Sequence, residues 1–312
     1  MDLSIIIVCY KGWEKLNRCL ESLNSFRGEK FSMEVLVVDN NSGDEVFNKF
    51  EEKFRKFRFI KNIINGGFSY GCNIGAANSK GECLLFLNPD TVAREDEVAK
   101  LLVAVKSDPD YFIVSCRQVL KNGKESKATG TFPGFSHQRI FQKSNYTVLF
   151  PDWVSGSVMM IRKEIFTKLN GFDEDFWMYS EDVDICRRAK DLGGEIVFFK
   201  DITVDHDHGG SSRIDLKTTS ITKCEVQISK HLYIQKHTTE LERLFLHSIL
   251  VVDNLITGII TGLLGLIFFF IPGLYVRFLI FIRILNYYLF SITMKSWLSP
   301  RSVNFSKIRS GK

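Results

Sequence analysis

Short apolar runs that alternate with helix-patterned segments constrain the fold of this chain most. The runs are LSIIIVC (3–9), MEVLVVD (33–39), RFIKNII (58–64) and CLLFLN (83–88). Three of them are apolar on both faces, which is typical of strands buried in a parallel sheet. Between the first two runs, Trp13, Leu16, Leu20 and Leu23 recur at helical spacing. The alternation predicts an α/β fold with a mainly parallel central sheet and helices on both faces.

The pattern continues beyond residue 90 with one interruption. A helix near 95–107 and a strand at 111–116 are expected first, and 117–150 then has the polar, irregular profile of an inserted loop or small lobe. Regular structure is expected again as a strand at 156–161, helices near 163–169 and 181–191, and a strand at 195–200. We predict a catalytic domain over 1–235 and a hydrophobic helical segment over 236–312.

Polar side chains follow several of these runs at the point where each strand ends. Tyr10 follows the first strand, Asp39 closes the second, and Asn88-Pro89-Asp90 closes the fourth. Each residue by itself also suits a turn or a helix cap. In open α/β sheets, however, ligands bind at the carboxyl ends of the strands. The recurrence therefore favours a shared ligand site at this edge.

Gly67, Gly71 and Gly75 recur at a spacing of four residues before the fourth strand. Small residues at this spacing permit either close helix–sheet packing or close approach of a nucleotide. The segment matches neither the G-x-G-x-x-G fingerprint nor a phosphate loop ending in Gly-Lys-Ser/Thr. Dinucleotide dehydrogenases and phosphate-loop NTPases are therefore disfavoured.

Two further clusters carry titratable side chains. Glu181, Asp182 and Asp184 follow Ser180, and either stabilise a helix N-terminus or include a general base whose pKa is raised by its neighbours. His206 and His208 follow the last strand. They are either solvated loop residues or ligands that hold a divalent metal together with Asp90.

Charge and cysteine content exclude some classes of protein. Seven of the 41 basic residues follow Asp253, where there is no acid, so the first 253 residues are near neutral and do not suit a nucleic-acid partner. The 7 cysteines form no C-x-x-C pair. This pattern favours free thiols in a reducing compartment and disfavours a zinc site.

Taken together, the motifs resemble those of family 2 glycosyltransferases, most closely the rhamnosyltransferase-like branch. The segments that carry the resemblance are IIIVCYKG, VLVVDNNSGD, NGGFSYGCNIG, LLFLNPDT, VSGSVMMIRKEIFTKLNGFDEDFWMYSEDVDICRRAKDLG and HDHGGSS, in this order. The resemblance implies a GT-A fold, a nucleotide-sugar donor such as a dTDP- or UDP-sugar, a divalent metal (Mg²⁺ or Mn²⁺) and inversion at the anomeric carbon. The Gln-x-x-Arg-Trp motif of processive synthases is absent, which favours transfer of one sugar.

The resemblance also implies roles for individual residues. Asp182 corresponds to the catalytic base, with Glu181 beside it, and Asp90 to the metal ligand, joined by His206 or His208. The donor-binding residues are Tyr10, Asp39, Gly67, Asn73, Gly75 and Asn88. Trp153, Ser155 and Gly156 correspond to positions that shape the acceptor and sugar pocket. Asn88 stands where the family more often has an aspartate, and Cys9-Tyr10-Lys11 replaces the usual Thr-Tyr-Asn.

The C-terminal segment predicts membrane association. Residues 254–276 are uncharged and interrupted by Pro272-Gly273, while 278–294 are apolar apart from Arg283 and Asn286. A helical hairpin that spans the bilayer and helices that lie in its interface both suit this pattern. The basic tail suits the cytoplasmic leaflet of the cell membrane. A hydrophobic homodimer interface is the alternative.

We therefore predict a single-sugar glycosyltransferase that acts on a glycan or lipid-linked acceptor in cell-envelope synthesis, with rhamnose from dTDP-rhamnose as the expected donor. The alternative is a catalytically inactive nucleotide-sugar-binding or scaffolding protein at the membrane. The presence of Asp39, Asp90 and Asp182 together favours the enzyme.

Overall fold

The computed structural model describes the chain except for residues 44, 133–138, 144–145, 208–214 and 306–312. It contains two compact units. The first comprises Met1–Asp173 and Glu181–Ser211, and the second Glu174–Ser180 and Ser212–Lys312. The division predicted from the sequence lies at residue 235, within the helix Leu216–His237, whereas in the structure this whole helix belongs to the second unit. Whether 1–235 forms an independent domain remains a prediction.

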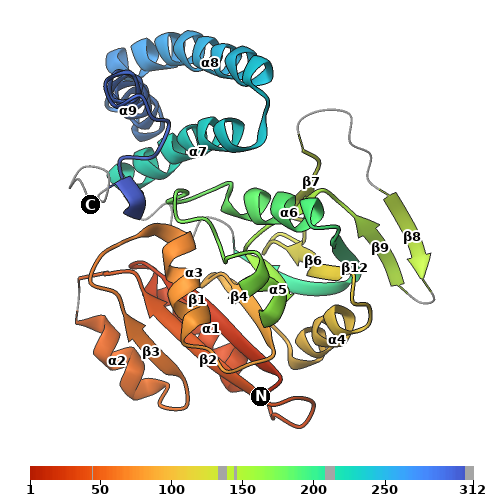
Figure 1. The fold of residues 1–312 in the computed structure, drawn as a ribbon. Coiled ribbons are helices and arrows are strands. Elements are labelled where there is room, and N and C mark those ends of the chain that lie inside the picture. Colours follow the sequence, from red (N-terminus) through yellow and green to blue (C-terminus); the bar gives the residue numbers. More distant parts are fainter. Residues whose placement is uncertain (44, 133–138, 144–145, 208–214, 306–312) are drawn as a thin grey trace. The chain divides into compact units, whose positions relative to one another are not determined.

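A 10-stranded sheet forms the centre of the first unit (Figure 1). Its strands run in the order β3-β2-β1-β4-β11-β6-β12-β9-β8, and β5 pairs with β12. The first four are parallel, β11 is antiparallel to both of its neighbours, and β12 is parallel to β6. These strands are β1 (Leu3–Cys9), β2 (Met33–Asp39), β3 (Arg58–Lys61), β4 (Cys83–Leu87), β5 (Thr91–Val92), β6 (Tyr111–Val119), β8 (Arg139–Lys143), β9 (Tyr146–Phe150), β11 (Val158–Arg162) and β12 (Glu195–His206).

Helices cover both faces of this sheet (Figure 1). They are α1 (Trp13–Asn24), α2 (Val46–Lys53), α3 (Gly67–Ala77), α4 (Glu95–Lys106), α5 (Lys163–Lys168) and α6 (Glu181–Asp191). Successive side chains of a strand point to opposite faces. Ile5 and Ile7 of β1 accordingly pack in one cluster with α1 and α4, whereas Ile6 packs in a second cluster with α3, α5 and α6. The α/β architecture predicted from the sequence is confirmed.

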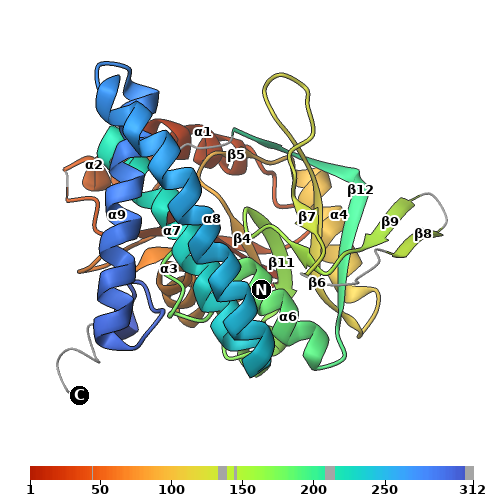
Figure 2. The same cartoon turned by 90° about the horizontal axis from the view of Figure 1, so that it is seen from above.

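The region from 117 to 150 is more regular than predicted. It contains β7 (Thr129–Gly130), β8 (Arg139–Lys143) and β9 (Tyr146–Phe150), followed by β10 (Trp153–Val154). Strands β9 and β8 extend the main sheet beyond β12 (Figure 2), while β7 and β10 form a separate pair. They were not predicted because they are short runs in a region of polar overall composition, although β9, YTVLF, is itself apolar and buries Val148 and Leu149.

The second unit is helical. It consists of α7 (Leu216–His237), α8 (Glu240–Ile267) and α9 (Pro272–Met294), together with the segment Glu174–Ser180. Added Cβ atoms at Gly258 and Gly262 would lie within 2.4 and 2.7 Å of the Phe281 ring. These glycines, which form a G-x-x-x-G pair in the sequence, therefore let α8 and α9 pack closely.

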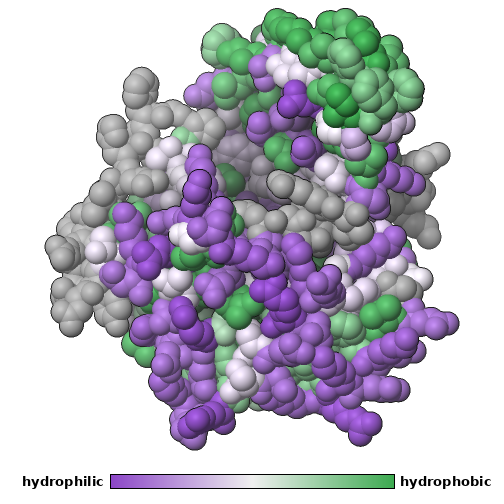
Figure 3. Space-filling view, turned by 180° about the vertical axis from the view of Figure 1, so that it is seen from behind, coloured by the Kyte–Doolittle hydropathy of each residue, from purple (hydrophilic) through white to green (hydrophobic). Residues whose placement is uncertain are grey.

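Helices α8 and α9 are both long and apolar enough to cross a membrane, by length and composition. Much of the apolar surface of these helices and of the connection between them is exposed, including Leu263 in α8 and Phe269 and Phe270 in the connection, which are 54%, 65% and 68% exposed. In Figure 3, hydrophobic side chains gather on the visible face of this unit. Large exposed apolar patches of this kind mark membrane or protein interaction sites.

Candidate active site

The loops after β1 and β2 are tied together beside Asp39. The Asp39 side chain is 1% exposed, and its carboxylate accepts hydrogen bonds from the backbone N–H and hydroxyl of Ser42. The Ser42 hydroxyl in turn accepts the backbone N–H of Lys11, at 2.8 Å. Tyr10 lies in the same loop, with the Lys11 ammonium 5.4 Å from the centre of its ring. The predicted base-binding residues Tyr10 and Asp39 thus occupy neighbouring strand ends, as expected from the parallel register of β1 and β2.

The segment after β4 forms a turn and is also hydrogen-bonded to the start of β11. The Asn88 carbonyl accepts the backbone N–H of Thr91 at 3.2 Å and its hydroxyl at 2.7 Å, which closes a tight turn around Pro89 and Asp90. The Asn88 backbone N–H donates to the Ser157 carbonyl at 2.9 Å. The turn therefore fixes Asp90 at the end of β4 and joins it to the start of β11.

Asp90 and His206 lie side by side. The Nε2 atom of His206 is 3.2 Å from Oδ1 of Asp90, and both residues are buried, at 3% and 7% exposure. Strand pairing sets this distance, because β5 follows Asp90 and pairs with β12 through Thr91 and His206. The other predicted ligand, His208, lies outside the described residues.

The donor set at this point fits a divalent cation. Carboxylate oxygen and imidazole nitrogen both suit Mn²⁺, and two ligands at right angles about 2.1 Å from one octahedral ion lie about 3.0 Å apart. Among the described residues, no group of three or more His, Cys, Asp or Glu side chains is arranged to hold a metal. A cation at Asp90 and His206 would therefore also need ligands from a bound diphosphate or water.

A turn of three small residues, 155–157, lies between Asp90 and the acids of α6. The backbone N–H of Gly156 donates to Oδ2 of Asp182 at 3.0 Å, and the Val183 N–H donates to Oδ1 at 2.9 Å. An added Cβ at Gly156 would lie 3.5 Å from the Asp182 Cβ and 3.3 Å from the Phe68 ring. Glycine thus permits a close approach of this turn to Asp182. The predicted acceptor residues Ser155 and Gly156 adjoin the predicted base.

The three acids of α6 have different surroundings. Asp184 is 1% exposed and pairs with Arg188 at 2.6 Å, which gives it a structural partner. Burial raises the pKa of Asp182, against the backbone N–H groups that favour its charged form. Burial, and next the nearby Asp182 charge, raise the pKa of Glu181 well above its usual range. Glu181 and Asp182 thus both have raised pKa values, whereas Asp184 is held by Arg188.

Three of the predicted residues have packing partners in the structure. An added Cβ at Gly75 would lie 2.4 Å from Cγ2 of Ile6, so this glycine brings α3 against β1. The Asn73 amide bonds to the backbone carbonyl and N–H of Phe172, at 2.8 and 2.9 Å. The Trp153 indole donates to the Thr131 carbonyl at 3.3 Å. Contact of these side chains with donor or acceptor remains a prediction.

Gly67 has a conformational role as well. Its φ of 87° lies in the left-handed region, which glycine adopts without steric cost. Its carbonyl accepts the Asn40 amide at 2.6 Å, and Asn40 Oδ1 accepts the Asn62 amide at 2.9 Å. These bonds connect the ends of β2 and β3 to the start of α3.

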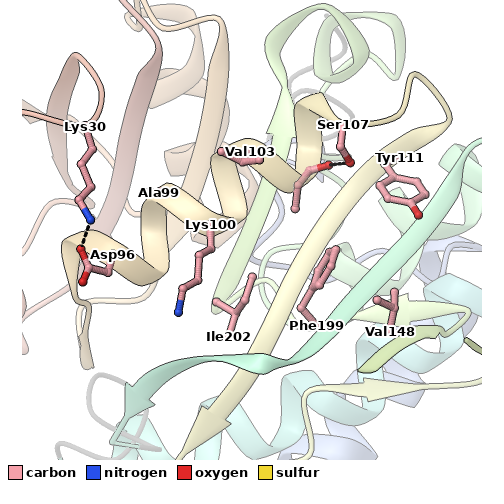
Figure 4. A pocket seen from close by; sticks show the side chains of 11 residues that line it. Lys30, Asp96, Ala99, Lys100, Val103, Ser107, Tyr111, Val148, Phe199 and Ile202 are labelled. Atoms are coloured by element: carbon pink, nitrogen blue, oxygen red, sulfur yellow. Dashed lines mark hydrogen bonds and ion pairs between the residues drawn. The ribbon is translucent and has the colours of Figure 1, made fainter. Parts of the chain in front are cut away.

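A pocket of about 520 Å³ lies elsewhere in the first unit, along α4 (Figure 4). Its walls include Val103, Tyr111, Phe199 and Ile202, and the Lys30–Asp96 ion pair lies at one end. None of its lining residues belongs to the predicted site.

One buried residue of the site was not identified from the sequence. Gln118 of β6 is 1% exposed, and its Oε1 lies 2.8 Å from His206 Nδ1 and 2.8 Å from the Ser157 hydroxyl. The only sign of it in the sequence is a polar amide at the end of an otherwise apolar run, which is a weak indication by itself.

Comparison with known proteins agrees with this interpretation of the site. The sequence model of the family described as glycosyl transferase family 2 matches residues 4–170. A second model, the N-terminal domain of galactosyltransferase, matches residues 137–208.

Curated relatives include two rhamnosyltransferases. Rhamnosyltransferase WbbL of Escherichia coli K12 is 27% identical over an alignment of 209 residues that covers 61% of this chain and 77% of WbbL. N-acetylglucosaminyl-diphospho-decaprenol L-rhamnosyltransferase of Mycobacterium tuberculosis is 27% identical over an alignment of 246 residues that covers 68% of this chain and 78% of that protein. The low-salt glycan biosynthesis hexosyltransferase Agl10 of Haloferax volcanii is 28% identical, and the chain spans 62% of its length.

Solved structures share the fold. GalNAc-T7 with UDP, GalNAc and Mn²⁺ gives a TM-score of 0.57 at 18% identity, covering 75% of this chain and 50% of that one. Mannosyltransferase PcManGT from Pyrobaculum calidifontis, in complex with GDP-Man and Mn²⁺, gives 0.52 at 14% identity, covering 80% and 69%. The fold is thus one on which nucleotide sugars and Mn²⁺ bind in other proteins.

Proposed function

The chain belongs to glycosyl transferase family 2, and from this premise we propose that it moves one rhamnose from dTDP-rhamnose to a lipid-linked or polysaccharide acceptor in cell-envelope glycan synthesis. Two relatives that are named rhamnosyltransferases support the choice of sugar. The name of the mycobacterial relative, which specifies a diphospho-decaprenol acceptor, supports a lipid-linked acceptor.

One observation carries the proposal. The Asp90–His206 pair and the Asp182 carboxylate are held by the two sides of a single turn, since the Ser157 carbonyl accepts from Asn88 while the Gly156 N–H donates to Asp182. A site for a diphosphate-bound cation and a general base are thus joined through rigid backbone. Preorganised geometry of this kind is what group transfer requires.

The residues act as follows in this proposal. Tyr10 and Asp39 hold the base of the donor nucleotide, and Asp90 and His206 hold a divalent cation. When bound, that cation offsets the negative charge that develops on the diphosphate leaving group. Asp182 takes the proton of the acceptor hydroxyl while the oxygen of that hydroxyl attacks C1 of the sugar from the face opposite the diphosphate. The C1–O bond to the diphosphate breaks in the same displacement, which inverts the anomeric carbon, as in inverting hydrolases where water is the nucleophile.

The helices of the second unit complete the proposal. An exposed apolar surface on α8 and α9 would place the protein at the membrane, where a lipid-linked acceptor resides. The basic residues Lys295 and Arg301 follow these helices and favour the anionic cytoplasmic leaflet.

The test is calorimetric binding of dTDP, UDP, GDP and ADP to the detergent-solubilised full chain, with Mn²⁺ and then with EDTA. A transfer assay with radiolabelled dTDP-rhamnose and extracted membrane lipids follows. Metal-dependent binding of dTDP together with label transfer is the expected result. Binding of a different nucleotide would show that the donor is not dTDP-rhamnose. Binding without transfer to any acceptor would favour the scaffolding alternative.

A further inference from the structure

Gln118 is a buried amide that lies between the two halves of the candidate site. Its strand position opposite Val204 places it on the same side of the sheet as His206, two residues further along β12. Burial of an amide is costly unless its polar atoms are hydrogen-bonded. Oε1 of Gln118 meets this need with two partners, His206 Nδ1 and the Ser157 hydroxyl, each at 2.8 Å.

The identity of the Gln118 atom that faces His206 determines where the imidazole carries its proton. A carbonyl oxygen only accepts hydrogen bonds, so a neutral His206 next to Oε1 must carry its proton on Nδ1. Its Nε2 lone pair then points toward Oδ1 of Asp90, 3.2 Å away. Two electron-rich atoms at this distance repel each other, and a cation bound beside them would offset that repulsion. The opposite orientation of the amide would place N–H groups against Nδ1, move the proton to Nε2 and remove the lone pair that a metal ion needs.

Gln118 also reaches the base side of the site. The Ser157 hydroxyl that donates to Oε1 lies 2.8 Å from the Ser155 hydroxyl. Gly156, between these two serines, donates its backbone N–H to Asp182. A single amide oxygen therefore anchors both the imidazole at Asp90 and the turn at Asp182.

The other end of the amide supports a role beyond packing. Among the described residues, Nε2 of Gln118 has no hydrogen-bond partner, although it is buried. Leaving a buried donor unsatisfied costs about 1–3 kcal/mol. An apolar residue of similar size would avoid this cost. Stability of the strand alone therefore does not explain a glutamine at this position.

We propose that Gln118 is a positioning residue that holds His206 in the Nδ1–H tautomer, so that Nε2 faces Asp90 and a bound cation, and that anchors the 155–157 turn against Asp182. The proposal rests on the metal site of the proposed function. It extends that site by a residue that contacts neither sugar nor metal and acts through His206 and Ser157.

The direct test is the tautomer of His206 in the metal-free full-length protein. Long-range ¹H–¹⁵N spectra of histidine-labelled protein in detergent distinguish the two tautomers, and His206→Asn identifies the resonance. We expect Nδ1 to be protonated and Nε2 to be unprotonated in the wild type. A proton on Nε2 would overturn the proposal, whatever the nucleotide or sugar specificity proves to be.

Variants of Gln118 supply the second readout, which is Mn²⁺ affinity measured from the electron paramagnetic resonance of the free ion. Loss of a partner that orients a metal ligand costs about 10- to 100-fold in metal affinity. We expect Gln118→Leu to weaken Mn²⁺ binding by this factor and to shift His206 toward the Nε2–H tautomer. Gln118→Glu, which keeps an acceptor oxygen, should restore both properties toward wild type.

Ser115→Ala is the matched control. Ser115 lies on the same strand, is fully buried and donates to the Val158 carbonyl at 2.6 Å, outside the Gln118 contacts. It should lower the melting temperature while leaving Mn²⁺ affinity and the His206 tautomer unchanged. Equal Mn²⁺ affinity in wild type and Gln118→Leu, with an unchanged tautomer, would contradict the proposal. If the wild type binds no Mn²⁺, the metal role in the proposed function fails, while the tautomer still tests the contact between Gln118 and His206.

Discussion

His206 Nε2 lies 3.2 Å from Asp90 Oδ1, although these two residues are more than 100 positions apart in the chain. The contact depends on the pairing of β5 with β12, which places His206 opposite Thr91. A short strand of two residues thus brings the aspartate and the histidine together.

We expect Asp90→Asn to leave the fold intact and to abolish metal-dependent binding of the donor nucleotide. The amide keeps the shape of the side chain but lacks the negative charge that a divalent cation requires. Calorimetry with dTDP and Mn²⁺ should show at least a 100-fold loss of affinity, converted from about 2.7 kcal/mol or more. Asp96→Asn, on the surface of α4, is the control and should bind as wild type does. Unchanged metal dependence in Asp90→Asn would reduce the Asn88-Pro89-Asp90 segment to a turn.

Asp182→Asn should lower kcat and spare donor binding. Removal of a general base costs about 100- to 10,000-fold in rate. Because burial raises the pKa of Asp182, the wild-type rate should rise with pH as this carboxyl ionises. Steady-state kinetics across pH would show both effects, with Asp191→Asn at the exposed end of α6 as the control. A variant that retains wild-type kcat would exclude Asp182 as the base.

Glu181 should make stability depend on pH in a defined direction. Its pKa is raised in the folded state, chiefly by burial, so the folded protein holds this proton more tightly than the unfolded chain does. The stabilising contribution is therefore complete below the unfolded-state pKa of about 4.3 and is lost as pH rises through the folded-state pKa. Glu181→Gln removes this titration and should flatten the decline. Thermal unfolding of both proteins between pH 5 and about 9 measures the difference, and parallel curves would contradict it.

Gly75→Ala should destabilise the first unit. The added methyl group meets Ile6 inside the packing of α3 on β1, and overpacking of this kind costs about 1–3 kcal/mol. Alanine recovers up to about 1 kcal/mol through its helix propensity, so a net loss of about 1 kcal/mol is expected in denaturant unfolding. Ala77→Ser, on the exposed side of the same helix, adds one atom without a clash. A stabilised Gly75→Ala protein would show that this packing is looser than the distance indicates.

The double substitution Phe269→Ser and Phe270→Ser should weaken membrane association. Both rings are mostly exposed at the junction of α8 and α9, and each buries apolar area worth about 1.5–3 kcal/mol when removed from water. Flotation with liposomes that contain anionic lipid should show a smaller bound fraction. Val103→Ser, an exposed residue of the first unit, should not change it. Equal flotation of all three proteins would favour a protein interface, such as a homodimer, over a lipid one.

Much of the fold was readable from the sequence because its signals are local. Strands such as Leu3–Cys9 and helices such as Trp13–Asn24 follow from apolar runs and helical spacing, and the order of motifs identified the family. Strands β8 and β9 were missed because they are short runs within a region of polar overall composition, although β9, YTVLF, is itself apolar and buries Val148 and Leu149. The roles of the glycines were open, and the close approach of Gly75 to Ile6 shows that at least this one brings helix and sheet together.

By itself, the sequence determined the fold class, the strand ends that carry polar side chains, and the candidate residues Asp39, Asp90, Asp182 and His206. The tertiary structure decided which of these meet. Contacts such as Asp90 with His206, or Gly156 with Asp182, join segments far apart in the chain, and their distances depend on strand register and turn geometry. Gln118 could be identified only from the tertiary structure, because the role of a buried amide depends on the partners that the folded chain places around it.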